Sequence, residues 1–450
     1  MYPAPPVTST VLPLIAHPRR RAGRSRSVAA GSRPSPRSWR NRTGGRRAAP
    51  SRAPTLTRQG VRETIGRAHD RAARLLLRRT GGPAVSDAPT DADGRAQGPA
   101  DVTVVTVTYD AGPLVLECLD SLAAQQLHGR RLEVVVVDNA SSDGTADLVA
   151  SQHPWVRLVR SSTNLGFAGG NNLALRRLRS RYVVLLNNDA TAEPDFVDRL
   201  VSAMDAAPAT VSAMAATVLL RERFRAADPD ERTAVEGPDG RWVADEHGGV
   251  ELVNSTGNEV RTDGFGVDRG WLADSAHHHP PRDVFGFSGA AAILRTSALR
   301  EVGLFDERYF MYYEDTDLSW RLRLAGFRIE HCPGAVVHHR HAASSGEGSE
   351  LFRFHDARNR LLTVSKDATA QLAIRVVGRF LLTTASIAVR RSQPAPLVRI
   401  RLRAFASYLR LLPSTLRERH RVGRTARVGR GAVEQLLVPP SRTPAGGYRS

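Results

Sequence analysis

The sequence predicts an α/β protein built on a parallel sheet, and two observations carry this prediction. From Val102 onward, short Val-rich runs alternate with helix-like segments up to about residue 206. Such alternation is typical of strands that are joined by right-handed helical crossovers within one sheet. The strand-like runs are continuously apolar, which indicates strands that are covered on both faces.

The predicted elements follow one another closely over residues 102–206. Each expected strand is a short apolar run, and each expected helix follows a proline or a polar or glycine-rich turn. The expected strands are 102–110, the first part of 132–145, 156–161 and 181–189. The strand within 132–145 ends in a polar turn. The expected helices are 113–126, 146–152, a segment from the glycine-rich turn 164–172 to about 179, and 194–206.

The regular pattern weakens after residue 206 and later returns. Residues 217–283 contain several glycines and turns, and we expect short strands there. Residues 284–332 are dense again, and the stretch YEDTDLSWRLRLAG places three acids at the start of a helix that ends near Gly326. A strand at 335–337 then leads into HHRHAASSG.

Charge divides the chain into three regions. Residues 1–100 contain 20 arginines and five acidic residues, residues 351–450 carry a net charge of +16, and the centre carries −12 within a total of +19. The N-terminal region is rich in Arg, Ser, Pro, Gly and Ala, a composition that cannot bury a core. We therefore expect a disordered extension at 1–100, a folded domain at 101–345 and a basic helical tail at 346–450.

The basic tail is the region that we expect at a membrane surface. Residues 372–389 are apolar but interrupted by two arginines, and residues 397–412 carry four. No run of 18 apolar residues occurs, so we expect no spanning segment. Basic amphipathic helices lie at anionic interfaces; the alternative is a helix packed on the core. Two cysteines far apart favour a reducing compartment, so the expected location is cytoplasmic, on the inner face of the plasma membrane.

Acidic residues follow three of the predicted strands. Asp110, Asp138 and Asp189 each come directly after a strand. A single aspartate there is usually a turn or cap residue, but the carboxyl ends of parallel strands share one edge, where ligands bind. Three acids on that edge favour a binding cleft. Asp189 and a histidine from 338–341 would suit Mg²⁺ or Mn²⁺.

Three acids also begin the helix predicted after residue 313. Acids in a first turn suit the helix dipole, and this explains Asp317. Glu314 and Asp315 are adjacent and follow two tyrosines, which is more than a cap requires. These two carboxyls are therefore candidates for chemistry.

The order of these motifs resembles the family 2 glycosyltransferases of the rhamnosyltransferase-like branch. The resemblance rests on VTYD, VVVDNASSDGT, NLGFAGGNN, LLNNDA, FSGAAAILR, VGLFDERYFMYYEDTDLSWRLRLAGF and HHRHAASS, spread over residues 101–345. It implies a GT-A fold and an inverting, metal-dependent transfer of a sugar, with rhamnose as the first choice and galactofuranose or mannose as alternatives. The donor would be a dTDP- or UDP-linked sugar. The acceptor would be a cell-envelope glycan or a lipid-linked glycan.

The resemblance also implies roles for individual residues. Thr108, Tyr109 and Asp138 would line the pocket for the base and ribose. The stretch Asn187–Asn188–Asp189 stands where the family has its D-x-D motif, and Asp189 would touch the metal.

The remaining implied roles concern catalysis and the second metal ligand. Asp315 matches the general base and Glu314 its acidic neighbour. His339 matches the histidine that completes the metal site, with His338 and His341 left open.

Two other classes of function would also use features of this sequence. A nucleotidyltransferase on a similar sheet would need a Lys-containing phosphate loop near the first strand, and residues 108–116 contain no lysine. A nucleic-acid-binding protein could use the Arg-rich ends, but residues 1–100 contain only two residues with aromatic rings of the kind that stack on bases, Tyr2 and Trp39. We expect no specific nucleic-acid partner.

Overall fold

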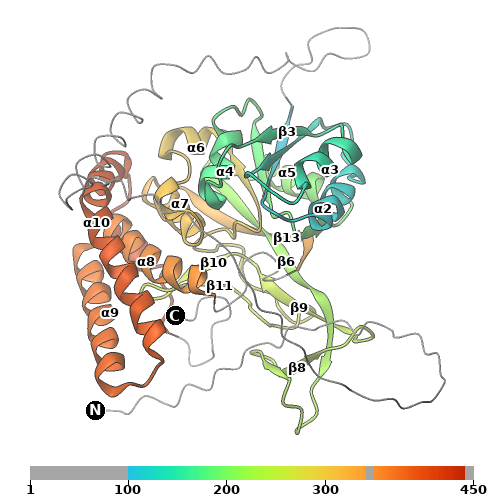
Figure 1. Ribbon diagram of the computed structural model, residues 1–450. Helices are drawn as coiled ribbons and strands as arrows, with labels where there is room; N and C mark the ends of the chain where they lie inside the picture. Colours follow the sequence, from blue (N-terminus) through green and yellow to red (C-terminus); the bar gives the residue numbers. More distant parts are fainter. Residues whose placement is uncertain (1–99, 341–348, 441–450) are drawn as a thin grey trace, which may run out of the picture. The chain divides into compact units, whose positions relative to one another are not determined.

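The computed structural model describes residues 100–340 and 349–440 of the 450-residue chain. The predictions for the N-terminal extension and for His341 therefore lie outside the described residues. Within them, a mixed sheet carries helices on both faces, and a group of long helices follows near the C-terminal end (Figure 1). The predicted α/β class and the helical tail are confirmed.

The first four predicted strands form a parallel set, as expected. They are β1 (Val102–Thr108), β2 (Leu132–Asp138), β3 (Arg157–Arg160) and β4 (Tyr182–Leu186), in the spatial order β3-β2-β1-β4. The helices that follow them are α2 (Pro113–Ala123), α3 (Thr145–Gln152), α4 (Gly166–Leu175) and α5 (Phe196–Ala206). The ends of these strands position the acidic residues that the sequence predicted at one edge of the sheet.

The other half of the sheet is mixed, and its antiparallel pairing was not predicted from the sequence. The strand β12 (Ala291–Arg295) runs antiparallel to both β4 and β6 (Val211–Ala226). Next to β6 lies β13 (Arg328–His339), which is parallel to it, and β5 (Ala190–Ala192) closes the edge antiparallel to β13. The start of β6 reads VSAMAA, and small residues of this kind give little strand signal.

The distal half of β6 leaves the main sheet and forms an arm, which extends downward in Figure 1. Within this arm, β6 pairs with β8 (Arg241–Ala244) and β9 (Val250–Ser255), and β7 (Val235–Glu236) pairs with β8. A separate two-stranded hairpin, β10 (Asn258–Val260) and β11 (Gly266–Asp268), follows β9. The turn between β9 and β10 returns the chain to the strand-end edge.

Two apolar cores cover the two faces of the sheet. One is formed with residues of α2, α3 and α5, and the other with residues of α4, α6 (Thr296–Val302) and α7 (Glu314–Leu324). A third core joins α7 to the tail helices α8 (Glu350–Asp367), α9 (Ala370–Arg390), α10 (Ala395–Thr425) and α11 (Arg430–Glu434). Every residue of α7 is buried as a result. The domain division at residue 345 stays a prediction.

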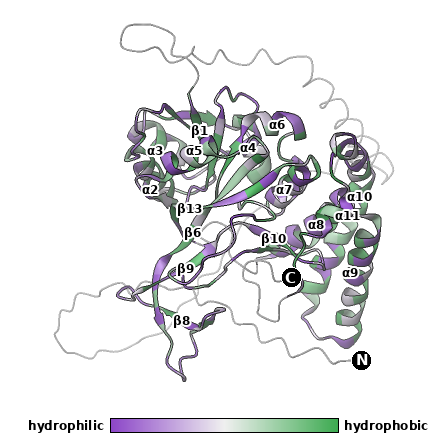
Figure 2. Cartoon of the chain, turned by 180° about the vertical axis from the view of Figure 1, so that it is seen from behind, coloured by the Kyte–Doolittle hydropathy of each residue, from purple (hydrophilic) through white to green (hydrophobic). Residues whose placement is uncertain are grey.

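One tail helix differs from what the sequence predicted about membranes. Among the described residues, α9 alone is long and apolar enough to cross a bilayer by length and composition, and 28% of its most apolar window is buried. We expected no such helix because Arg375 and Arg379 interrupt the apolar run. Figure 2 shows hydrophobic residues along this helix as well as in the sheet.

Candidate active site

The edge formed by the carboxyl ends of β1, β2 and β4 brings the predicted strand-end residues together. Thr108 ends β1 and lies opposite Asp138, which ends β2. On the other side of β1, β4 ends just before Asn187–Asp189. Thr108 and Asp138 are buried, whereas Tyr109 is 49% exposed. Asp110 follows β1 on the same edge, and its carboxylate accepts the backbone N–H of Ser142 at 2.6 Å.

Hydrogen bonds at this edge leave one carboxylate oxygen without a partner. Asn188 Nδ2 donates to Thr108 Oγ1 at 3.2 Å, which joins the ends of β4 and β1. Asp138 Oδ2 accepts the N–H of Ser141 at 3.4 Å. Asp138 Oδ1 is buried and has no hydrogen-bond partner among the described residues. A buried acceptor of this kind calls for a donor from a ligand or water.

A carboxylate and an imidazole meet beside this edge. His339 lies opposite Ala190 where β13 pairs with β5, so its ring reaches the residue that precedes Ala190. His339 Nε2 is 3.0 Å from Asp189 Oδ1 and 3.4 Å from Asn187 Nδ2. On its other side, His339 Nδ1 is 2.7 Å from Asn254 Oδ1. Because an amide oxygen only accepts, His339 Nδ1 donates to Asn254, and Nε2 is the ring nitrogen that faces Asp189 and Asn187.

The Asp189–His339 pair fits a divalent ion with few protein ligands. Two ligand atoms at about 2.1 Å from an octahedral ion and at right angles are roughly 3.0 Å apart, as these two atoms are. In the part of the chain that the structure describes, no group of three His, Cys, Asp or Glu residues could hold a metal. Mg²⁺ is usually bound by one or two carboxylates together with waters and substrate phosphates, so two protein ligands are sufficient.

The other candidate histidine that the structure describes turns to a different partner. His338 Nε2 is 3.0 Å from Glu193 Oε1, at a partly exposed position. Side chains of adjacent strand residues point to opposite faces, which separates His338 from His339. Of these two, His339 is the one that contacts Asp189.

The carboxyls of Glu314 and Asp315 are both buried at the start of α7, in different hydrogen-bonding environments. Asp315 Oδ2 accepts Asn258 Nδ2 at 2.9 Å and the Gly289 N–H at 3.0 Å. Asp315 Oδ1 accepts the Thr316 N–H at 2.6 Å. Glu314 Oε2 is buried without a partner among the described residues.

These environments separate the pKa values of the two carboxyls. Burial raises the pKa of Asp315, although hydrogen bonds from Gly289, Asn258 and Thr316 oppose the shift. Burial, reinforced by the neighbouring Asp315 charge, raises the pKa of Glu314 well above its ordinary value. Asp315 is therefore the member of the pair that more readily ionises, and burial favours the neutral form of Glu314. Two carboxyls separated in this way suit acid and base roles in one site.

Two short segments that sequence reasoning did not single out hold these groups in place. Residues 288–290 bridge α7 and β4, because the Gly289 N–H donates to Asp315 while the Ala290 carbonyl accepts the Asn187 N–H at 2.9 Å. The strands that flank the β9–β10 turn supply Asn254, from β9, to His339 and Asn258, from β10, to Asp315. The motif FSGAAA contained Gly289 without indicating its role. Nothing in the irregular stretch 217–283 marked the two asparagines.

Asp317, the third acid of this helix, has a role that the sequence did not predict. Asp317 makes no N-terminal cap, since the N-cap position is Tyr313 and has no side-chain cap. Its carboxylate instead pairs with Lys366 at 2.7 Å and with Arg321 at 2.9 Å. Asp317 therefore links α7 to α8.

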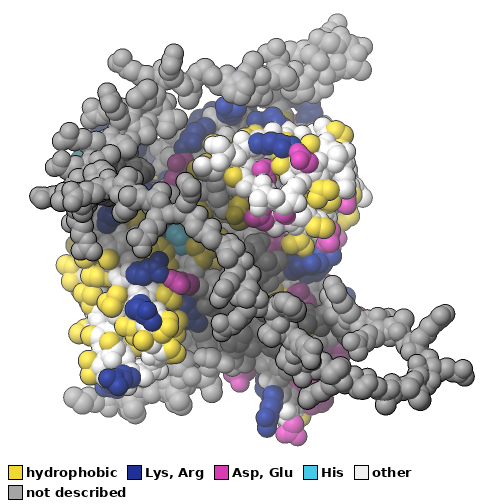
Figure 3. Space-filling view, in the orientation of Figure 1, with side chains coloured by type: hydrophobic (Ala, Val, Ile, Leu, Met, Phe, Trp, Pro, Cys, Tyr) yellow, Lys and Arg dark blue, Asp and Glu magenta, His cyan; other side chains and the backbone are white. Residues whose placement is uncertain are grey.

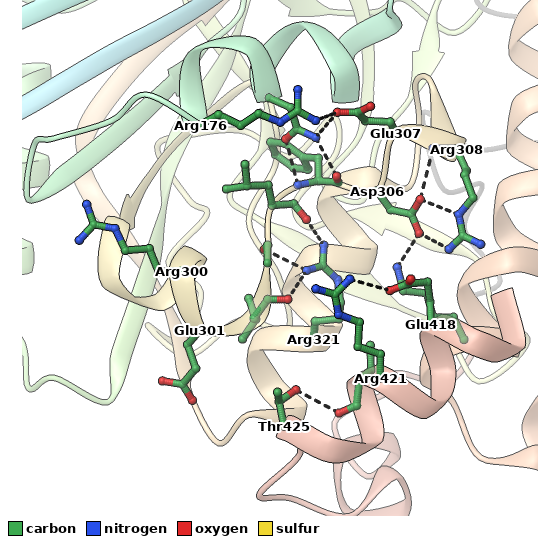
Figure 4. Close-up of a pocket in the computed structure, with 17 residues that line it drawn as sticks. Arg176, Arg300, Glu301, Asp306, Glu307, Arg308, Arg321, Glu418, Arg421 and Thr425 are labelled. Atoms are coloured by element: carbon green, nitrogen blue, oxygen red, sulfur yellow. Dashed lines mark hydrogen bonds and ion pairs between the residues drawn. The ribbon is translucent and has the colours of Figure 1, made fainter. Parts of the chain in front are cut away.

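A separate cavity of about 430 Å³ lies among α4, α6, α7 and α10 (Figure 4). Its lining carries six basic and four acidic side chains. Some of them pair with each other, as Arg176 does with Glu307 and Arg308 with Asp306. None of the predicted site residues lines it. The candidate active site is therefore the strand-end edge and the start of α7.

Strand-end acceptors, a carboxylate–imidazole pair that fits a divalent ion and a buried carboxyl pair are consistent with a nucleotide-sugar glycosyltransferase. Comparison with known proteins agrees, since residues 103–238 match the Glycosyl transferase family 2 model and residues 264–361 the Glycosyl transferase family group 2 model. This chain belongs to glycosyltransferase family 2 and is a nucleotide-sugar glycosyltransferase. The predicted family and enzyme class are confirmed.

The chain is also similar to individual proteins, of which the first, at 32% identity, shows the same family. An N-acetylglucosaminyl-diphospho-decaprenol L-rhamnosyltransferase from Mycobacterium tuberculosis is 32% identical over 258 residues, 54% of this chain and 77% of the relative. The low-salt glycan biosynthesis hexosyltransferase Agl10 of Haloferax volcanii is 24% identical over 57% of this chain and 73% of the relative. A solved mannosyltransferase from Pyrobaculum calidifontis, in complex with GDP-Man and Mn²⁺, is 20% identical, with a TM-score of 0.40 over 84% of this chain and 96% of that chain.

Proposed function

We propose that the enzyme transfers rhamnose, with inversion, from a dTDP- or UDP-linked donor to a hydroxyl of a lipid-linked or cell-envelope glycan. The observation that carries the chemistry is the pair of buried carboxyls at the start of α7, of which Asp315 alone is stabilised by donors on both oxygens. The choice of sugar and acceptor is supported by the similarity to the mycobacterial relative, whose name specifies L-rhamnose and a diphospho-decaprenol acceptor.

In this proposal Asp315 is the general base. A sugar hydroxyl is a poor nucleophile, and a positioned carboxylate that takes its proton as the new bond forms accelerates transfer by roughly 10²–10⁴-fold. The raised pKa of Asp315 makes it a stronger base than an ordinary aspartate. One base acting from the face opposite the leaving group gives inversion at the anomeric carbon. Neutral Glu314 beside it adds no second negative charge.

The strand-end residues would bind the donor. Asp138 Oδ1 has no partner among the described residues and would accept an N–H of the base, with Thr108 and Tyr109 lining the same pocket. Asn187 and Asn188 would contact the ribose and diphosphate. Asp189 and His339 would hold Mg²⁺ or Mn²⁺, which when bound neutralises the negative charge that accumulates on the leaving diphosphate.

The deciding experiment replaces each carboxyl separately. Asp315→Asn should lower the turnover number by 10² to 10⁴-fold, while donor affinity, measured by thermal shift with dTDP-rhamnose and Mg²⁺, stays within a few fold. Glu314→Gln is the matched control and should retain more activity, because that side chain is already neutral. An active Asp315→Asn enzyme would move the base role to Glu314 and overturn the assignment. A donor screen in the same assay tests rhamnose against other sugars.

We also propose that the enzyme contacts the cytoplasmic face of the plasma membrane through the basic hairpin, defined as residues 370–417 of α9 and α10. This hairpin contains nine arginines and no acidic residue. Its large exposed apolar side chains recur at helical spacing on each helix: Ile374, Leu381, Leu382, Val389, Leu402, Leu409 and Leu416. Figure 3 shows hydrophobic side chains over α9 and α10, interspersed with Lys and Arg.

The composition of this face matches an anionic lipid surface. Each arginine near such a surface contributes on the order of 1 kcal/mol, and each buried Leu or Ile side chain about 1.5–3 kcal/mol. A combined Ile374→Ser, Leu382→Ser and Val389→Ser variant should lose binding to phosphatidylglycerol-containing vesicles. The control is Trp155→Ser, which removes an exposed aromatic side chain outside the hairpin. Salt should weaken binding of the parent protein. Failure of the full-length protein to bind these vesicles at low salt would refute this location.

A further inference from the structure

The segment 309–313, which leads directly into Glu314 and Asp315, is held in an unusual backbone conformation. Phe310, Tyr312 and Tyr313 have φ values of +67°, +68° and +69°, although none is glycine. Bulky side chains rarely adopt this region. Phe310, with a ψ of −65°, is also the centre of a tight three-residue turn in which the Met311 N–H donates to the Tyr309 carbonyl at 2.8 Å. Turns of this kind are rare and strained.

A single amide on α8 holds this segment. Asn359 is fully buried, and its Nδ2 lies 3.0 Å from the Tyr309 carbonyl, 2.8 Å from the Met311 carbonyl and 2.7 Å from the Tyr312 carbonyl. An amide has two hydrogens, so at least one is shared between two of these carbonyls. All three carbonyls belong to the strained segment.

The neighbouring residue on α8 orients that amide. Arg358 Nε donates to Asn359 Oδ1 at 2.9 Å, which fixes which end of the side chain presents nitrogen. Arg358 Nη2 donates to the carbonyls of Arg308 and Tyr309, each at 2.9 Å. Carbonyls from residues 308–312 are thus satisfied by two consecutive residues of the tail helix.

The segment is also held from the side of the sheet. The Ala168 N–H, near the start of α4, donates to the Phe310 carbonyl at 3.1 Å. Gly166 packs so closely that a Cβ there would lie 2.3 Å from the Phe310 oxygen. Strained backbone persists only where its surroundings determine it from several sides, and such strain gathers at functional sites.

We propose that Asn359 is a positioning residue for the transfer reaction: it holds segment 309–313 in its strained form and so fixes the start of α7, which carries Asp315. This inference rests on the proposed role of Asp315 as the base. It differs from a general packing role because it predicts a loss of turnover that exceeds any loss of donor affinity. It also assigns a catalytic purpose to the first tail helix.

The test replaces the amide with a side chain that cannot bridge three carbonyls. Asn359→Ser should lower the turnover number by roughly 10²-fold, the scale expected when a reacting group is misplaced, with the KM for donor changed by a few fold at most. Hydrogen exchange of residues 309–317 should become faster. The matched control is Ser365→Ala, which removes another buried hydrogen bond of α8, to Tyr408 at 3.0 Å, without touching the segment. That control should destabilise the protein without changing turnover.

A second substitution separates positioning from packing. Tyr312→Gly gives the chain a residue that adopts positive φ without strain, so it should restore part of the turnover in the Asn359→Ser background. If Asn359 had only a packing role, Tyr312→Gly would restore no turnover. The Tyr312→Gly variant by itself shows how much turnover is lost with the tyrosine ring. The cycle of four proteins isolates the coupling.

The results of this test can be distinguished from a failure of the proposal that Asp315 is the base. Unchanged turnover in Asn359→Ser, or unchanged exchange of residues 309–317, would overturn the positioning role even if Asp315→Asn is inactive. An active Asp315→Asn enzyme would instead refute the base assignment, while hydrogen exchange would still decide whether Asn359 holds the segment.

Discussion

Replacing Lys366 with methionine should be among the most damaging single changes in the tail. Lys366 is the sole lysine among the 64 Lys and Arg residues of the chain, and its side chain is 3% exposed. Its Nζ lies 2.7 Å from Asp317 on α7 and 2.8 Å from Asp306. Asp306 also pairs with Arg308 beside the charged cavity (Figure 4). Methionine has a similar volume to lysine, but the substitution removes a positive charge that faces two buried carboxylates.

The expected size of the effect follows from burial. Breaking a buried ion pair by removing one partner costs about 3–5 kcal/mol. For a domain of this size each kcal/mol lowers the Tm by about 2–4 °C, so the loss should be roughly 6–20 °C. The control is Arg403→Met, which breaks the α10–α8 ion pair with Glu350 at a position where both side chains are more than half exposed. Exposed pairs contribute about 0–1 kcal/mol.

The pH dependence gives an independent check. Burial works to raise the pKa of Asp306 and Asp317, but hydrogen bonds and charges from Arg308, Arg321 and Lys366 outweigh it, so both pKa values lie below the ordinary value. Such groups stabilise the fold above their unfolded pKa of about 3.9. That stability is lost as the pH falls through the folded values.

The difference in unfolding free energy between the parent and Lys366→Met should therefore be full at pH 7 and should shrink below about pH 4. Urea unfolding at several pH values measures it. A Lys366→Met protein as stable as Arg403→Met at pH 7 would refute the reasoning, and so would a difference that does not change with pH.

Three further outcomes are expected. Asp189→Ala should weaken metal-dependent donor binding, and chelation by EDTA should reproduce the loss in the parent enzyme; donor binding and turnover that survive chelation would contradict the metal site. The acidic limb of the turnover–pH profile should lie above pH 3.9, the ordinary aspartate value, because burial raises the pKa of Asp315, and a limb at or below that value would count against it. Gly166→Ala should destabilise the fold by more than about 1–2 kcal/mol, since the φ of Gly166 is +68° and a Cβ there would meet Phe310. The control is Gly378→Ala, at a helical glycine with open space around it. This control should leave the thermal stability unchanged or raise it.

The parallel half of the sheet could be predicted from sequence because its signals are local. The Val-rich runs of β1, β2 and β4 are long, and each ends in polar residues that cannot continue a buried strand. Parallel pairing then places Asp138 and Asp189 on one edge without further information. The antiparallel half could not be predicted in this way, since β6 begins with small residues and pairs with β12, which lies about 80 residues away in sequence.

The groups that orient the site were harder to predict because each is defined by contacts distant in sequence. Asn254 and Asn258 gain their roles only when the β9–β10 turn reaches His339 and Asp315. Asn359 gains its role when α8 packs on the segment before α7. A single asparagine in a loop or helix carries no local pattern that distinguishes these uses.

The helix α7 shows why the tail and the site have to be considered together. Its residues Leu318 and Leu322 enter the core beneath the sheet, whereas Trp320 and Leu324 enter the core shared with α8 to α10. Sequence periodicity would place Arg321 and Arg323 at solvent, yet both are buried, Arg321 against carbonyls of residues 302–304 and Arg323 against carbonyls of residues 284, 285 and 329. The Arg321 guanidinium is satisfied by Asp317 and by carbonyls that precede Phe305. A helix buried on all sides moves only with its neighbours, so the packing of α8 on α7 and the ion pair of Lys366 with Asp317 tie the tail to the helix that carries Asp315.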